Sequence, residues 1–162
     1  MKESKLNRDC VDFILKKCQE ITAPPPVYYK IADAFTKGIP DSVLNWNERT
    51  SWLEFKLLGP NESIHDQLDK HQLVELIKLE RTSHRAWVVA FRKANVAKRI
   101  LPQTIIYRPR KLWHEQVPQP VESVMPVLRQ LLEYGVAQGP GFNHQMVWEL
   151  IHDTHIWQGV SR

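Results

Sequence analysis

The spacing of apolar residues predicts a helix over residues 9–21. Its apolar side chains recur at helical intervals and would share one face: Val11, Ile14, Leu15, Cys18 and Ile21. Three consecutive prolines at 24–26 cannot continue this helix, because proline lacks a backbone N–H and its ring clashes with the preceding turn. The first predicted element is therefore an amphipathic helix that ends before residue 24.

Three strands, a helix and a fourth strand are predicted next. Residues 27–35 form the first strand. Residues 41–46 and 50–57 form a hairpin that turns through residues 47–49. After a polar loop the remaining two elements of this core follow: a helix over residues 70–81, with Asp69 as its N-cap, and an apolar strand over residues 86–91. The order is αβββαβ, which predicts an α/β fold.

The remaining residues are predicted to add a strand and a helical extension. Residues 104–107 are a further short strand. The extension covers residues 118–162 and contains two helices, over 123–135 and 143–157, which start at a serine and an asparagine, residue types that favour N-caps. At this length the chain is expected to form a single domain over residues 1–162.

Neither a membrane span nor a disulfide is expected. No apolar run approaches the roughly 20 residues that cross a bilayer. The N-terminus lacks the apolar stretch of a secretory signal, which predicts a cytoplasmic protein. Cys10 and Cys18 lie eight residues apart in one predicted helix, about 12 Å along its axis, so both are expected to be free thiols.

Charge is distributed unevenly along a chain whose formal net charge is only +4. Residues 81–111 contain no Asp or Glu and carry nine basic residues: Arg81, Arg85, Arg92, Lys93, Lys98, Arg99, Arg108, Arg110 and Lys111. Such a segment suits a polyanion, although a solvated basic surface binds many anions nonspecifically. With DNA as the partner, the expected contacts are these residues apart from Arg81, together with Lys37.

The predicted hairpin brings together groups that suit a divalent cation. Glu54 and Lys56 share one face of their strand, because alternate residues do, and Asp41 lies on the neighbouring strand. Two carboxylates about 4 Å apart repel by roughly 4 kcal/mol at an effective dielectric of 20, and a cation removes this penalty. Magnesium prefers oxygen ligands, here Asp41, Glu54 and the Phe55 carbonyl. Lys56 would then orient the attacking water or help to deprotonate it. The alternative is a Glu–Lys pair on the sheet surface.

Four motifs occur in order within residues 9–92: Thr36-Lys-Gly-Ile-Pro-Asp41, Trp52-Leu-Glu-Phe-Lys56, Leu68-Asp-Lys-His-Gln72 and Trp87-Val-Val-Ala90. Together they resemble the PD-(D/E)XK nuclease superfamily, most closely its virus-type replication-repair nucleases (VRR-NUC), which are similar to Holliday-junction resolvases. The resemblance implies a restriction-endonuclease-like αβββαβ core with a mixed sheet flanked by helices. It also implies hydrolysis of phosphodiester bonds with Mg²⁺, for which Mn²⁺ can substitute.

Site roles also come from the resemblance. It implies that Asp41 and Glu54 are metal ligands and that Lys56 is the catalytic lysine. Gln72 corresponds to the glutamine that faces the active site from a helix in this family. A local role is the alternative, since Asp69-x-x-Gln72 also fits a capping box. The two roles are compatible.

One expected group is missing from the pattern. Many relatives carry a glutamate in the first helix that joins the metal site, whereas the predicted helix offers only Asp9, Asp12 and Glu20, none of which lies on the apolar stripe. Either the site lacks this member or Asp12 replaces it.

The resulting hypothesis is a Mg²⁺-dependent DNA endonuclease that acts on branched or structured DNA in phage or recombination-repair processing. By analogy with the family, cleavage leaves a 5′-phosphate and a 3′-hydroxyl, and the protein acts in the cytoplasm of a prokaryote or of a phage-infected cell. A homodimer would suit a branched substrate. The alternatives are a nuclease that acts on ends, flaps or plain duplex, and a noncatalytic nucleic-acid-binding subunit with the same fold. A zinc site at His144, His152 and His155 has weak support, because no fourth ligand accompanies them.

Overall fold

The protein is built around one six-stranded mixed sheet. The structure, a computed structural model, describes residues 2–21, 24–31, 38–83, 85–114 and 116–156. The strands, in their order across the sheet, are β1 (Val27–Lys30), β2 (Ser42–Trp46), β3 (Arg49–Leu58), β4 (Ala86–Arg92), β5 (Gln103–Tyr107) and β6 (Val136–Pro140). β3 and β4 are parallel, and the other neighbouring strands are antiparallel.

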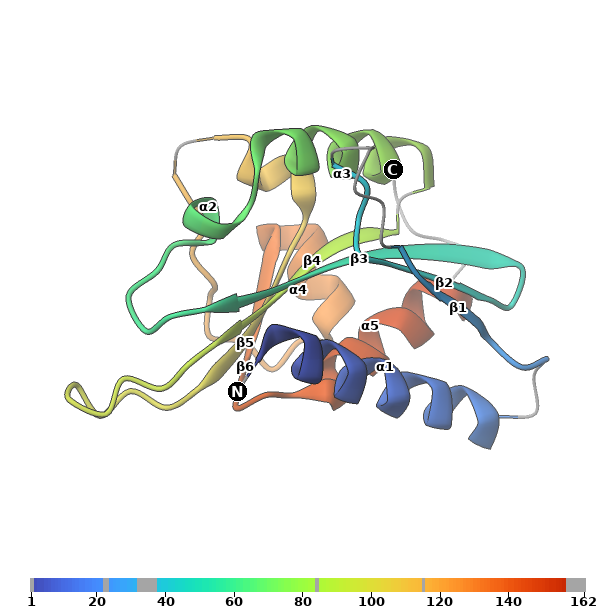
Figure 1. Cartoon of the computed structure of the whole chain (residues 1–162), viewed down its shortest axis with the longest axis horizontal. Coiled ribbons are helices and arrows are strands. Elements are labelled where there is room, and N and C mark those ends of the chain that lie inside the picture. Colours follow the sequence, from blue (N-terminus) through green and yellow to red (C-terminus); the bar gives the residue numbers. More distant parts are fainter. Residues whose placement is uncertain (1, 22–23, 32–37, 84, 115, 157–162) are drawn as a thin grey trace.

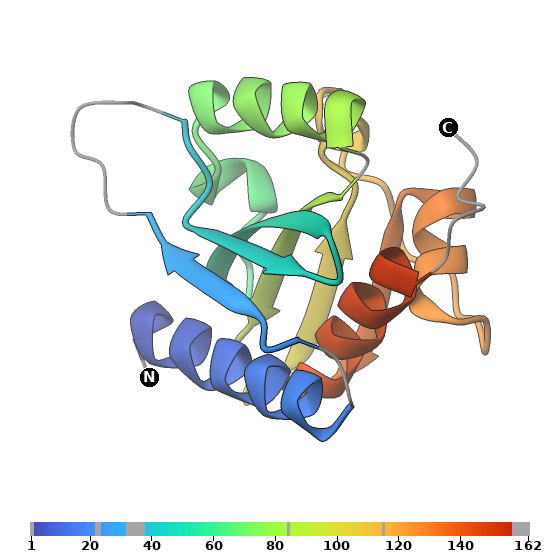
Figure 2. The ribbon, with the colours of Figure 1, turned by 90° about the vertical axis from the view of Figure 1, so that its right-hand side faces the viewer.

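Helices cover both faces of the sheet, as Figures 1 and 2 show. One layer contains α1 (Glu3–Glu20), α4 (Val127–Tyr134) and α5 (His144–Ile156). The opposite layer contains α2 (Ile64–Gln67), α3 (Lys70–Ser83) and the 3₁₀ helix η1 (Pro109–Leu112). The fold is therefore α/β, with a mixed sheet flanked by helices, as the sequence predicted.

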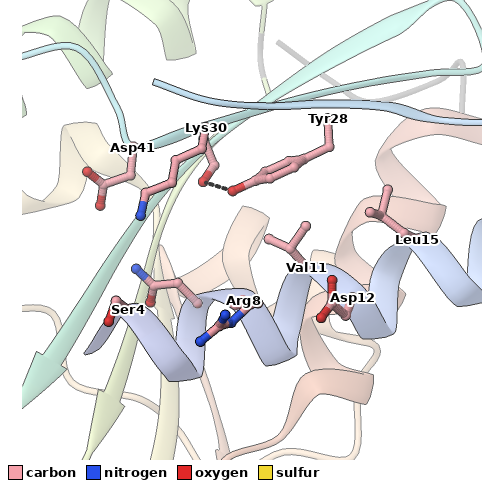
Figure 3. A pocket seen from close by; sticks show the side chains of 10 residues that line it. Ser4, Arg8, Val11, Asp12, Leu15, Tyr28, Lys30 and Asp41 are labelled. Carbon is pink, nitrogen blue, oxygen red and sulfur yellow. Dashed lines mark hydrogen bonds between the residues drawn. The ribbon is translucent and has the colours of Figure 1, made fainter. Parts of the chain in front are cut away.

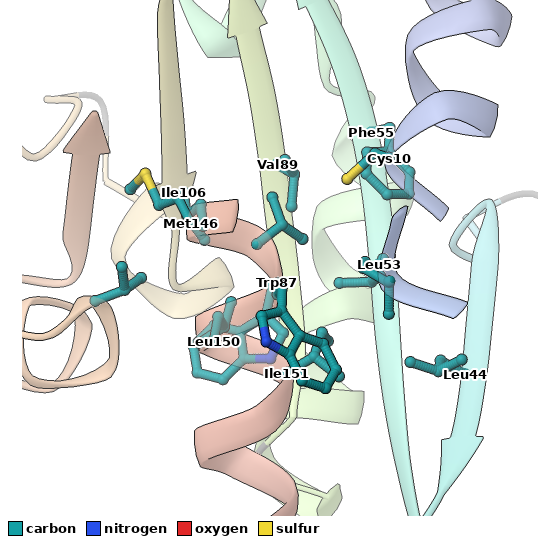
Figure 4. Close-up of a cluster of buried hydrophobic side chains, with 14 of the residues drawn as sticks. Cys10, Leu44, Leu53, Phe55, Trp87, Val89, Ile106, Met146, Leu150 and Ile151 are labelled. Atoms are coloured by element: carbon teal, nitrogen blue, oxygen red, sulfur yellow. The ribbon is translucent and has the colours of Figure 1, made fainter. Parts of the chain in front are cut away.

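Side chains alternate along β3, so its core residues point to one face of the sheet and the candidate site residues Glu54 and Lys56 point to the other. Leu53 and Phe55 pack with Trp87 of β4 against α1 and α5 (Figure 4). Glu54 and Lys56 lie between them in sequence and therefore point to the α3 side of the sheet. Burial of one apolar row thus fixes the orientation of the polar row.

Both cysteines belong to this core and are free, as predicted. Cys10 and Cys18 are buried on the apolar face of α1. Burial raises the pKa of both thiols, that of Cys18 to about 11, because the thiolate is poorly solvated there. At neutral pH both are protonated and pack as small apolar side chains.

The predicted order of elements from the first helix to the fourth strand is present, with different boundaries. α1 begins at Glu3, six residues earlier than predicted. The hairpin turns through Asn47 and Glu48, both with positive φ, as a two-residue loop requires. The loop predicted before α3 contains the short helix α2, which starts with a capping box at Ser63. β1 ends at Lys30, and part of the first predicted strand lies outside the described residues.

The C-terminal part is not purely helical, which corrects the prediction. β6 pairs with β5 at the end of the sheet. Its Gly139 and Pro140 are rare in strands and concealed it, but proline is tolerated on an edge strand because no further neighbour needs its N–H. α4 begins at Val127, with Pro126 as its N-cap, and the Ser123 hydroxyl instead accepts the Met125 N–H.

The last predicted helix is confirmed within the described residues. The Asn143 side chain accepts the Met146 N–H at 3.0 Å, so Asn143 is the N-cap of α5. The apolar face of α5 is buried, as expected from the periodicity: Met146, Val147, Leu150 and Ile151. Trp157 lies outside the described residues.

A buried histidine fixes the end of α5 to the β2–β3 hairpin. The Nδ1 of His155 donates to the Trp46 carbonyl at 2.6 Å, and its Nε2 accepts from the Ser51 hydroxyl at 2.7 Å. Because a carbonyl can only accept, this arrangement requires the neutral ring with its proton on Nδ1. Burial lowers the pKa of His155 to about 4. Since both ring nitrogens bind protein groups, His155 has a structural role.

This histidine should make the protein less stable in acid. In the unfolded chain its pKa is about 6.5, so the unfolded state gains a proton first as the pH falls. The contribution of His155 to the free energy of unfolding is therefore fully present above pH 6.5. It is lost as the pH falls toward 4, by about 3 kcal/mol in total. Urea unfolding of the wild type and His155→Gln at pH 7 and pH 4.5 measures it. The variant should be less stable at pH 7 and lose less on acidification; equal losses would contradict this assignment.

Candidate active site

The candidate site forms where β2 and β3 diverge. β2 pairs with β3 only as far as Leu53, so the following part of β3 has no β2 neighbour. The amides of Phe55 and Leu57 are two residues apart and point toward this opening. The Phe55 backbone hydrogen-bonds the Asp41 carboxylate, and the Leu57 N–H donates to Glu3 Oε2 at 2.8 Å. Carboxylates thus satisfy strand amides that a neighbouring strand would otherwise bind.

Glu54 is the centre of the site and has no exposed surface (0%). Its Oε1 accepts from Gln72 Nε2 at 2.9 Å and forms an ion pair with Lys56 Nζ at 2.8 Å. Its Oε2 accepts the Asp41 backbone N–H at 3.0 Å. The Lys56 side chain is only 12% exposed. The Glu54–Lys56 pair of the alternative interpretation is therefore present, but it is buried and does not lie on the sheet surface.

The two carboxylates are crowded in a poorly solvated place. Burial raises the pKa of Glu54, and the nearby Asp41 carboxylate raises it further, against the opposing effect of Lys56. Burial also raises the pKa of Asp41, again partly offset by Lys56. Burial is the largest cause of both shifts, so the charged forms of Asp41 and Glu54 are poorly solvated here. A cation bound at Asp41 and Glu54 would favour these charged forms.

Lys56 is held in its charged form. Burial alone would lower the pKa of Lys56, but the neighbouring carboxylates outweigh burial and raise it; the largest contribution comes from Glu54, followed by Asp41 and Glu3. At neutral pH Lys56 is therefore an ammonium group, which donates hydrogen bonds and stabilises negative charge.

Gln72 makes contacts that fit both roles considered from the sequence. Its side-chain oxygen accepts the Asp69 N–H at 3.2 Å, as in a capping box, while the Asp69 carboxylate caps the helix by accepting the His71 N–H at 2.6 Å. Its side-chain nitrogen reaches Glu54 at the same time. The start of α3 is thereby connected directly to the buried carboxylate.

These two roles can be separated by mutation. Asp69→Ala removes only the helix cap and should cost about 1 kcal/mol of stability without changing turnover. Gln72→Ala should cause a similar loss of stability and, in addition, lower turnover about tenfold, because Glu54 loses a hydrogen bond that fixes its position. Urea unfolding of both variants, together with an assay of the nuclease activity that the resemblance implies, tests this. Equal turnover in the two variants would reduce Gln72 to a helix cap.

Glu3 is the site residue that the sequence interpretation missed. It lies in the first turn of α1, binds the Leu57 amide, and its charge acts on both Asp41 and Lys56. It was overlooked because the apolar pattern placed the start of the helix at residue 9. The available signal was its acidic side chain at a helix start, where acidic residues are favoured.

Asp12 occupies a different place. It lies nine residues after Glu3, about 13 Å further along the helix axis. Its side chain is exposed, and among the described residues no hydrogen bond or salt bridge joins it to Asp41 or Glu54. Of the acidic residues of α1, the geometry favours Glu3 over Asp12 as a member of the site.

The basic segment does not form one surface. Glu80 of α3 is buried and binds Arg108 at 3.2 Å and Arg110 at 2.6 Å, so these two expected DNA contacts take part in an internal ion-pair network. Arg92 donates to the Glu62 carbonyl, and Arg85 donates to the Thr50 carbonyl.

The other expected contacts are scattered. Lys93, Lys98 and Arg99 are exposed on the loop that connects β4 to β5, and Lys111 is exposed on η1. Lys37 lies outside the described residues. Proximity in sequence therefore does not make the segment of residues 81–111 a single binding face.

The donor set can be tested against magnesium, the metal that the resemblance implies. Asp41 and Glu54 converge at the opening, and the Phe55 carbonyl points to the same side as its amide, as in any strand. Across the described ranges, no three His, Cys, Asp or Glu side chains lie close enough to hold an ion by themselves. Two carboxylates and a carbonyl still fit Mg²⁺, which usually keeps several waters.

Comparisons with known proteins add no family assignment. No protein-family model matches the chain, and no similar curated protein or solved structure was found. The likeness to PD-(D/E)XK nucleases therefore depends on the four motifs. Separately, none of the helices that the structure describes is long and apolar enough to cross a bilayer.

Proposed function

We propose that this protein is a Mg²⁺-dependent nuclease that hydrolyses phosphodiester bonds in DNA. The observation that carries the proposal is the convergence of Asp41, Glu54 and Lys56 at the opening between β2 and β3, with Glu54 buried and bound by Gln72. Burial and the nearby Asp41 carboxylate both disfavour the charged form of Glu54, which is the kind of perturbed carboxyl group often found at functional sites.

Asp41, Glu54 and the Phe55 carbonyl would hold the cation, with Glu3 beside them. When bound, Mg²⁺ supplies positive charge to the phosphate oxygens and a water molecule of lowered pKa. Mn²⁺ offers the same oxygen preference and would substitute. The raised pKa values of both carboxyl groups agree with this assignment, because burial disfavours their charged forms and a bound cation would favour them.

Lys56 has the properties needed next to a reacting phosphate. Its ammonium group is fixed at 2.8 Å from Glu54 and remains charged at neutral pH. It can orient the attacking water through a hydrogen bond and stabilise charge that develops on the phosphate. Gln72 holds Glu54 from the other side, which keeps the spacing between carboxylate and ammonium constant.

The specific substrate proposed is branched or otherwise structured DNA, cleaved to leave a 5′-phosphate and a 3′-hydroxyl. Both parts of this proposal come from the family resemblance, as does the placement in phage or recombination-repair DNA processing. A homodimer would match the two-fold symmetry of a junction. The alternatives are cleavage of ends, flaps or plain duplex. A noncatalytic binding subunit is less well supported, because binding alone gives no reason to keep Lys56 against a buried carboxylate.

The purified protein should be incubated with four-way, flap, single-stranded and duplex DNA, each with Mg²⁺, with Ca²⁺ and with excess chelator. We expect cleavage in Mg²⁺ only, with the four-way or flap substrate cut fastest. Calcium should support binding without turnover, because its looser coordination positions water poorly. Full activity in chelator would exclude the metal mechanism, and binding without cleavage of any substrate would favour the noncatalytic alternative.

A further inference from the structure

A cleft of about 360 Å³ begins at Asp41 and runs between α1 and the β1–β2 edge of the sheet (Figure 3). Asp41 and Lys30 stand at one end, and Asp12 and Leu15 lie toward the other. Arg8 also lines the cleft and lies on α1, below Lys30 and Tyr28 in this view. The cleft therefore shares Asp41 with the candidate active site, whereas Glu54 does not line it.

Two cations in this cleft remain available to a ligand. Arg8 and Lys30 are both exposed, and within the described part of the chain neither forms a salt bridge. By contrast, the expected DNA contacts Arg108 and Arg110 are bound to Glu80. The charge of Lys30 also reaches Asp41, where it opposes the rise in the pKa of that carboxyl. A phosphate beside Asp41 would lie within the influence of Lys30.

The walls of the cleft are partly apolar and partly fixed. Val11 and Leu15 provide apolar surface from α1. The Tyr28 hydroxyl is hydrogen-bonded to the Ser42 hydroxyl at 3.0 Å, which holds the tyrosine ring against the opposite wall. Its volume is at the lower end of the range of about 300 to 1,000 Å³ for small-ligand pockets. Two cationic side chains beside a small, partly apolar cleft suit a single nucleotide of an unpaired strand better than a duplex.

We infer that this cleft holds the DNA strand that is cleaved, with Arg8 and Lys30 on the phosphates next to the scissile one. This inference rests on the proposed function and deepens it, since it assigns the path of the strand and predicts that the strand is locally unpaired. Asp12 repels phosphate at the far end, so the strand leaves the cleft before reaching it.

The test compares three double variants, each of which removes two exposed positive charges. Arg8→Gln with Lys30→Gln alters the cleft. Lys93→Gln with Lys98→Gln alters the β4–β5 loop. Lys16→Gln with Arg129→Gln is the matched control, with one exposed site on α1 and one on α4, neither of which lines the cleft.

The readout is binding of a fluorescently labelled single strand in Ca²⁺, measured by anisotropy over a range of salt concentrations. Each phosphate contact contributes about 0.7 to the slope of log affinity against log salt on single strands. The cleft variant should lower the slope by about 1.4, and the control should leave it unchanged. A cleft variant that behaves like the control, a loss confined to the loop variant, or no binding by the wild type overturns the inference.

A second measurement distinguishes failure of this inference from failure of the proposed function. On the substrate that the wild type cleaves in Mg²⁺, the cleft variant should raise KM several-fold with little change in kcat, because its residues bind the strand without touching the metal ligands. If the wild type cleaves DNA but the cleft variant matches the control, only the strand path is wrong. If the wild type cleaves nothing but the slope falls in the cleft variant, the cleft binds DNA and the proposed catalysis is wrong.

Discussion

Replacement of Glu54 by Gln is expected to abolish cleavage while DNA binding is kept or strengthened. The substitution removes one negative ligand of the proposed metal, and several kcal/mol of transition-state stabilisation depend on that metal. A loss of about 4 kcal/mol corresponds to a fall in turnover of about 10³-fold. Binding should not suffer, because one negative charge near the phosphate is lost. The side-chain oxygen of Gln can still accept from Lys56 and Gln72.

Asp41→Asn should have the same effect, since it removes the second carboxylate of the pair. Both variants are measured by single-turnover cleavage in Mg²⁺ and by binding in Ca²⁺. Glu80→Gln is a matched control, because Glu80 is also a buried carboxylate that forms ion pairs. Its partners are Arg108 and Arg110, which do not belong to the candidate site. It should lose stability and keep turnover. Comparable turnover in Glu54→Gln and Glu80→Gln would show that Glu54 is only a structural carboxylate.

Replacement of Lys56 by Ala is expected to lower turnover by roughly 10²- to 10⁴-fold with little change in substrate affinity. The ammonium group is expected to act on the attacking water or on the charge that develops in the transition state, and neither contributes to ground-state binding. Removal of the cation also leaves Glu54 and Asp41 without their main compensating charge, so the pKa of both carboxyl groups should rise further.

The same single-turnover and binding assays separate the two possible roles of this lysine. Lys78→Ala is the control for loss of one lysine, because Lys78 is an exposed residue of α3 that forms a surface ion pair with Glu75 on the same helix. Lys56→Arg keeps the charge but changes the hydrogen-bond geometry, and intermediate turnover is expected. If affinity falls and turnover does not, Lys56 is a phosphate contact and the proposed chemistry has no role for it.

Local pattern was sufficient for the elements that carry the site. The two-residue period of a strand places Glu54 and Lys56 on one face, and the apolar residues between them must enter the core. The helical period gave α3 and its capping box, and with them the position of Gln72. These features depend on residues close together in the chain, so they could be read from the sequence alone.

Tertiary packing determines in part which residues belong to the candidate site. Glu3 precedes the apolar stripe, and its bond to the Leu57 amide joins residues 54 positions apart. This contact exists because α1 packs beneath the end of β3 where β2 has diverged. Local periodicity does not show which part of a strand lacks a neighbouring strand. The sequence therefore suggested Asp12 as the first-helix member of the site, whereas the structure places Glu3 there.

The fate of the basic segment was likewise decided only in three dimensions. The sequence by itself determined a chain rich in positive charge over residues 81–111, an α/β order of elements and a carboxylate–lysine pair on one strand face. Tertiary structure paired Arg108 and Arg110 with Glu80 about 30 residues away and placed Arg8 and Lys30 in the cleft that begins at Asp41. The physical reason is that the sequence shows how many charged residues a segment has but not which of them form ion pairs inside the protein. A charged side chain is available to a ligand only if folding leaves it without such a partner.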